Sequence, residues 1–84
     1  MKLITALNTL KTEKEVNNFL KDLCTPSEIY ALEERWEVAK MLYKGESTYR
    51  EIASTLNTST ATVTRVARFL FKESNNGYLS ILKK

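Results

Sequence analysis

Several residue types that carry chemistry are missing or scarce in this chain of 84 residues. It has no histidine, so the commonest general base and metal ligand of proteins is absent. Its single cysteine, Cys24, can form neither an internal disulfide nor a zinc site. There is no glycine-rich phosphate-binding loop. We therefore predict no catalytic residue, no metal and no cofactor, and a protein that is not an enzyme.

Long apolar runs are also missing, so nothing in the sequence is expected to span a membrane. The first residues contain no continuous apolar core followed by a small-residue cleavage site, and we expect no signal peptide. The lone Cys24 fits a reducing compartment and is interpreted as a small buried residue. These features predict a cytoplasmic protein.

Two glycines and one proline leave few places where helices can break, and the spacing of the apolar residues is helical. A threonine followed three residues later by glutamate occurs at Thr12, Thr25 and Thr48, and this pattern is typical of a helix start. Gly45 should end the third helix. The expected helices span residues 3–11, 13–23, 26–44, a short helix beginning after Thr48, 59–71 and 78–83.

The third helix has apolar residues almost all round. Ile29, Leu32, Trp36, Ala39 and Tyr43 form one stripe, and Tyr30, Val38, Met41 and Leu42 lie largely off it. A helix of this kind is usually buried on several sides. A chain this short has little material to cover it, so a second subunit is the simplest cover. The alternative is a wide core stripe in a compact monomer.

Three acidic residues, Glu33, Glu34 and Glu37, cluster on this helix. We interpret them as a solvated charged face and not as paired catalytic carboxylates.

The spacing of Ala53, Asn57 and Val63 is typical of a helix-turn-helix, in which two short helices cross closely at a small residue. Asn57 stands where the turn needs a positive φ, which asparagine tolerates. Ser59 or Thr60 should cap the second helix of the pair. Residues 47–84 carry six basic and two acidic residues, a net charge of +4, whereas residues 1–46 carry seven basic and eight acidic ones. The positive charge therefore lies with the helix-turn-helix and favours attraction to phosphate.

The outward face of the second helix starts with short uncharged residues that allow close approach to base edges in the major groove. Arginines follow at its far end, and another arginine opens the preceding helix. The predicted DNA-contacting residues are Arg50, Thr60, Ala61, Thr62, Thr64, Arg65, Arg68 and Lys72. The alternative is that these threonines are ordinary capping and surface residues, although threonine is a poor choice for a free helix surface.

From about Leu23 onward the chain resembles the Trp repressor family. The resemblance rests on Thr25-Pro26, Arg35, Gly45-Glu46, Arg50-Glu51 and TATVTR at 60–65, and is closer still to the shorter YerC/YecD-like branch. It implies an all-α fold of about six short helices, an interlocked homodimer, and a recognition helix at 59–71.

The resemblance also marks Arg35 and Arg65 as possible ligand-binding residues, because they match two arginines that grip the corepressor in tryptophan-sensing members. Val66 and Phe69 stand where those members have glycine and serine. Two bulky apolar groups would fill the space that an indole needs, so tryptophan is not expected as an effector. Arg35 would then pair with a glutamate of its own helix or bind another anionic ligand.

The sequence thus predicts a homodimeric, sequence-specific transcriptional regulator of double-stranded DNA, a repressor that binds a pseudo-palindromic operator. We expect a single domain, with dimerisation and core helices at 1–46, the helix-turn-helix at 47–72 and a C-terminal helix at 73–84. Two alternatives stay open: a helix-turn-helix that binds proteins, and a repressor gated by a small-molecule effector other than tryptophan.

Overall fold

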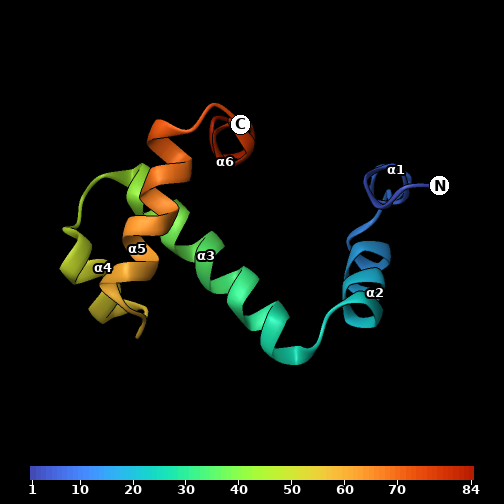
Figure 1. Cartoon of the computed structure of the whole chain (residues 1–84), viewed down its shortest axis with the longest axis horizontal. Coiled ribbons are helices and arrows are strands. Elements are labelled where there is room, and N and C mark those ends of the chain that lie inside the picture. Colours follow the sequence, from blue (N-terminus) through green and yellow to red (C-terminus); the bar gives the residue numbers. More distant parts are fainter. The chain divides into compact units, whose positions relative to one another are not determined.

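The computed structural model describes all residues from 1 to 84, and it is entirely helical. The predicted all-α fold is confirmed. No helix is both long and apolar enough to cross a bilayer. The elements are α1 (Leu3–Asn8), α2 (Glu13–Leu23), α3 (Pro26–Lys44), α4 (Tyr49–Thr55), α5 (Thr60–Ala67), η1 (Arg68–Lys72) and α6 (Gly77–Leu82) (Figure 1).

The starts of α2, α3 and α4 follow the predicted pattern. In each, the hydroxyl of a threonine accepts a hydrogen bond from the backbone N–H of the glutamate three residues later. The carboxylate of that glutamate in turn accepts a hydrogen bond from the backbone N–H of the threonine. These reciprocal bonds satisfy backbone donors that a helix start leaves without partners. The pairs are Thr12–Glu15, Thr25–Glu28 and Thr48–Glu51.

The turns also fall where the sequence places them. Gly45 follows α3 with a φ of +73°, and Asn57 follows α4 with a φ of +54°. The first helix is shorter than predicted: α1 ends at Asn8 instead of residue 11. The Thr9 hydroxyl donates to the Ala6 carbonyl at 2.7 Å, and this bond uses a carbonyl of the last turn and closes the helix.

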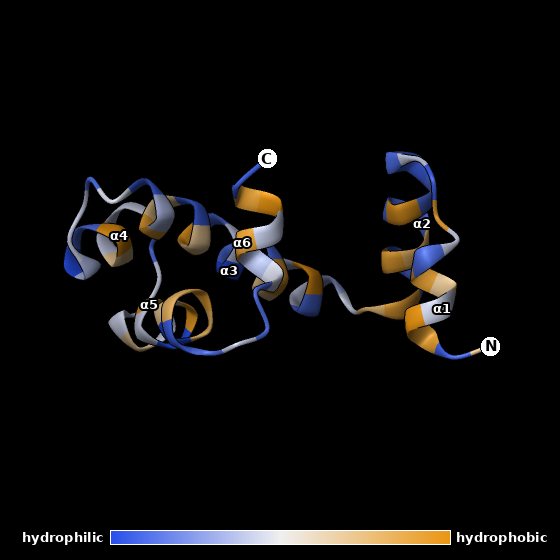
Figure 2. Cartoon of the chain, turned by 90° about the horizontal axis from the view of Figure 1, so that it is seen from above, coloured by the Kyte–Doolittle hydropathy of each residue, from blue (hydrophilic) through white to orange (hydrophobic).

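The chain divides within α3 into two compact units, Met1–Ala31 and Leu32–Lys84. The first unit contains no buried side chain. Its apolar residues occur along α1, α2 and the start of α3 (Figure 2), and Ile4 is 79% exposed. The other large apolar side chains exposed there are Met1, Leu3, Leu7, Val16, Leu23 and Tyr30. Cys24, expected to be buried, is half-buried.

The second unit has an apolar core. Its buried residues are Val38, Ala39, Leu42, Ile52, Ala53, Val63, Val66, Ala67 and Leu70. α6 adds Tyr78, Leu79 and Leu82, which pack against this core as expected. The Tyr78 ring stacks on Trp36 with centroids 6.3 Å apart and planes 19° apart. The core therefore joins α3, both helices of the helix-turn-helix and α6.

The buried face of α3 differs from the predicted stripe. Val38 and Leu42, expected off the stripe, are buried with Ala39, whereas Leu32 and Tyr43 are exposed. The helix-turn-helix covers the side of α3 that carries Val38 and Leu42. The single-domain interpretation stays a prediction.

Candidate nucleic-acid interface

The turn between α4 and α5 holds the two helices close together. Asn57 adopts the left-handed conformation predicted for it. The Thr58 N–H then donates back to the Ala53 carbonyl at 2.9 Å, which closes the end of α4. Ser59 caps α5 by accepting the Thr62 N–H at 3.1 Å. Ala53, the small residue expected at the crossing, is buried.

α5 is divided sharply into an inner and an outer face. Val63, Val66 and Ala67 are buried. Thr60, Thr64 and Arg68 follow at intervals of four on the exposed side, and Ala61 and Arg65 lie beside them, also exposed. Only Thr62 among the predicted contact residues of this helix is half-buried, next to its cap Ser59. The outer face is therefore short and uncharged at its start and basic at its end.

The structure adds a tyrosine that sequence reasoning did not name. Tyr49 and the predicted Arg50 are the first two residues of α4, and both are exposed. Tyr49 lines a hollow of about 410 Å³ together with Thr64, Arg68 and Lys72. Its place directly after the cap Thr48, in the first turn of the predicted helix-turn-helix, is the only signal in the sequence that could have indicated it.

The far end of the predicted recognition helix is not a regular α-helix. Where the sequence predicts one helix over 59–71, α5 runs from Thr60 to Ala67 and continues into the π-helical turn η1, Arg68–Lys72. The Glu73 N–H donates to the Arg68 carbonyl, five residues back, at 3.0 Å. This wide turn lets the Glu73 carboxylate reach Arg68 Nε at 3.2 Å. Turns of this kind are frequent at functional sites.

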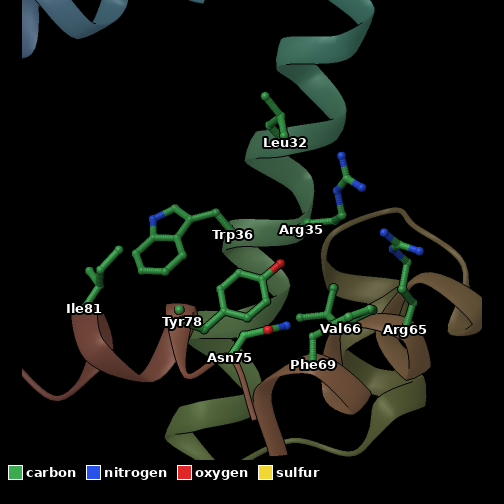
Figure 3. A pocket seen from close by; sticks show the side chains of 10 residues that line it. Leu32, Arg35, Trp36, Arg65, Val66, Phe69, Asn75, Tyr78 and Ile81 are labelled. Atoms are coloured by element: carbon green, nitrogen blue, oxygen red, sulfur yellow. The ribbon is translucent and has the colours of Figure 1, made fainter. Parts of the chain in front are cut away.

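Arg35 and Arg65 both line one cavity of about 620 Å³ in the second unit (Figure 3). Apolar side chains form much of the remaining wall, among them Trp36, Tyr78 and Phe69. The Arg65 guanidinium carbon lies 5.4 Å from the centroid of the Phe69 ring, a cation–π distance. The cavity thus brings the two arginines of the possible ligand site to one place.

Glu34 has a role that the sequence reading did not assign. Its neighbours Glu33 and Glu37 are exposed, as expected of a solvated face, but Glu34 is half-buried. Its Oε1 accepts the Thr58 hydroxyl at 2.6 Å, across 24 positions of sequence. No local motif could have revealed this contact.

A family model described as Trp repressor protein matches residues 1–84. The chain belongs to the Trp repressor family. It is 44% identical over 68 residues to YerC of Bacillus subtilis (strain 168), described as an uncharacterized protein, and the match covers 81% of the chain and 64% of that relative.

Two solved structures are similar as well, each at 42% identity, a TM-score of 0.86 and 96% coverage of the chain. One is a TrpR-like protein from Eubacterium eligens ATCC 27750, of which 81% is covered. The other is described as a candidate Trp repressor from Staphylococcus aureus, of which 79% is covered. Membership of the Trp repressor family, predicted from the sequence, is therefore confirmed. The members of this family are DNA-binding regulators and not enzymes.

Proposed function

We propose that the chain is a sequence-specific, DNA-binding transcriptional regulator that recognises its operator through the outer face of α5. The observation that carries this proposal is the exposed row of Thr60, Thr64 and Arg68 on a helix whose opposite side is locked into the core. Threonine methyls and hydroxyls can contact base edges, and arginine can bind guanine or phosphate. Because the core holds the opposite side of α5, the helix can enter the major groove in a fixed orientation.

The regulator acts as a homodimer in this proposal. The first unit leaves large apolar side chains such as Leu3 and Ile4 exposed and fully buries none, and a second copy of the chain would cover them. Two recognition helices then lie in successive major grooves, about 34–36 Å apart, on a pseudo-palindromic site. A dimer bound over a promoter blocks RNA polymerase, so the proposed effect on transcription is repression. The proposed location of the protein is the cytoplasm.

In vitro selection from random duplex DNA at near-physiological salt tests this function. We expect an enriched inverted repeat with half-sites about one helical turn apart. Sedimentation of the same sample should show two chains bound to each duplex. A folded protein that enriches no duplex would argue against the proposal and for a helix-turn-helix that binds proteins. Salt separates these two functions, because binding through several phosphates weakens steeply as salt rises.

A second candidate function, gating by a small effector, is favoured by the cavity that holds Arg35 and Arg65. Two guanidinium groups at an apolar cavity suit a ligand with an anionic group and an apolar body. In this case the selection would enrich an operator only when the ligand is present. A regulator that needs no effector would enrich the same operator without any added ligand.

A further inference from the structure

We infer that Glu34 and Thr58 set the spacing between the two half-sites that the dimer accepts, and that both act as positioning residues without touching DNA. This inference rests on the proposed function. It starts from the 2.6 Å bond between the Thr58 hydroxyl and Glu34 Oε1. That length is in the range of charge-assisted O–H···O⁻ bonds, which are stronger than neutral ones.

Thr58 stands at the point that determines where α5 begins. Its N–H closes α4 on the Ala53 carbonyl, and the next residue, Ser59, caps α5. The Thr58 side chain points instead to α3, where Glu34 lies one turn before the buried Val38. One residue therefore joins the end of α4 and the start of α5 to the long helix.

The apolar core fixes which side of α5 is buried, but its contacts define the direction of the helix less strictly than a hydrogen bond does. Contacts such as those of Val38, Ile52 and Val63 are non-directional. A hydrogen bond fixes one atom against another in distance and angle. The Glu34–Thr58 bond therefore supplies the directional restraint between α3 and the first turn of the recognition helix.

α3 also carries this restraint toward the twin subunit. The helix is continuous from Pro26 to Lys44 and is the covalent link between the second unit and Met1–Ala31, to which we assign dimer contacts. The angle between α3 and α5 therefore affects where the second recognition helix meets the duplex. Loss of the restraint should relax the spacing and leave the contacts within one half-site unchanged.

Thr58→Val tests the inference, since valine keeps the shape of threonine and removes the hydroxyl. The matched control is Thr55→Val, which changes an exposed threonine at the end of α4. Affinity is measured for an isolated half-site, for the selected inverted repeat, and for repeats with one base pair added or removed. We expect wild type and Thr55→Val to bind the altered repeats at least about tenfold more weakly, the scale of a mismatched base pair.

Thr58→Val should reduce this discrimination to about threefold or less, because a looser α5 adjusts to either spacing. Its affinity for the isolated half-site should stay within a factor of about two of wild type. Exchange of the Thr62 and Val63 amides, which donate to Ser59, should be faster in Thr58→Val than in Thr55→Val, and this measures the restraint without DNA. A structural defect alone would weaken all duplexes equally, and that result would overturn the inference.

A second series changes the acceptor in case Thr58→Val folds poorly. Glu34→Gln keeps an oxygen that can accept the Thr58 hydroxyl and should keep most of the discrimination. Glu34→Ala should lose it, and Glu33→Ala, with the same change in charge, should not. If wild type binds no duplex, the proposed function and this inference both fail. If wild type discriminates and Thr58→Val does so equally, this inference alone fails.

Discussion

Arg68 Nε lies 3.2 Å from Glu73 Oε2, and the wide turn of η1 brings the two together. The side chains are 66% and 39% exposed. A pair so open to solvent stabilises the fold by no more than about 1 kcal/mol. Its consequence is electrostatic, because Glu73 partly neutralises a cation at the basic end of the proposed DNA-contacting face.

Glu73→Gln should therefore strengthen DNA binding. With Arg68 available to phosphate, the plot of log K against log salt should steepen by about 0.9, the value for one added phosphate contact. Titration of the selected duplex at several salt concentrations measures this slope. Glu46→Gln is the control, since it makes the same charge change beside Lys44, outside the helix-turn-helix. Equal changes in slope for both variants would contradict a specific role of Arg68.

Thr62→Glu should abolish operator binding while the helices stay intact. Thr62 is the third residue of α5, three after its cap Ser59. Glutamate there completes a capping box and lies near the positive end of the helix dipole, so the fold is favoured. On the proposed DNA-contacting face, the added negative charge should repel the phosphates. Circular dichroism and a binding titration measure the two effects, with Thr62→Gln as the uncharged control. Retained binding by Thr62→Glu would show that α5 is not the recognition helix.

The stability of the fold should decrease in acid through its capping glutamates. Hydrogen bonds from the backbone N–H and then the side chain of Thr48 hold the pKa of Glu51 below its ordinary value. Thr25 lowers the pKa of Glu28 in the same way. A carboxylate with a lowered folded pKa stabilises the fold above its unfolded pKa, and this stabilisation is lost as pH falls through the folded value.

Glu51→Gln should consequently lower Tm at about pH 7 and converge with wild type in acid below the folded pKa of Glu51, because the wild-type carboxyl is then protonated and as uncharged as glutamine. Thermal unfolding followed by circular dichroism at the two pH values measures the change. Glu33→Gln, an exposed residue of α3, should match wild type at both. A difference between Glu51→Gln and wild type that persists unchanged into acid would exclude this titration as its cause.

L-Tryptophan should change neither the Tm nor the DNA affinity of the wild-type protein. Val66 is 1% exposed, and it lines the arginine cavity with Phe69, whose ring lies under the Arg65 guanidinium. A bound ligand at a hundred times its Kd would add about 2.7 kcal/mol of stability, which thermal unfolding detects easily. Phe69→Ser, which enlarges the cavity, is the comparison variant. A clear rise in Tm for wild type would restore tryptophan as the effector.

The parts of the fold that depend on near neighbours could be predicted from the sequence. The capping pairs Thr12–Glu15 and Thr48–Glu51 need only residues three apart, and both form. The bounds of α2 and α3 agree with the prediction. Asn57 has the positive φ that was predicted for the turn from its residue type. Family membership was predictable for the same reason, since its motifs are short and local.

The remainder depends on contacts between distant residues. The Glu34–Thr58 bond spans 24 positions, and periodicity places Glu34 on a solvated face. The buried side of α3 is selected by the helix-turn-helix that packs on Val38, which helical spacing alone cannot identify. The π-helical turn at Arg68–Lys72 has no sequence signal that we can name. Convergence of Arg35 and Arg65 on one cavity likewise required the fold.

The absence of any fully buried side chain in Met1–Ala31 should also make this segment sensitive to proteases. A segment without a fully buried core opens locally at a lower cost in free energy than one with such a core, and proteases cut open segments. Any partner that binds the folded segment shifts its equilibrium toward the folded form and so protects it from proteases. Uncovered chains would be degraded first, so turnover would remove surplus copies and spare those already engaged.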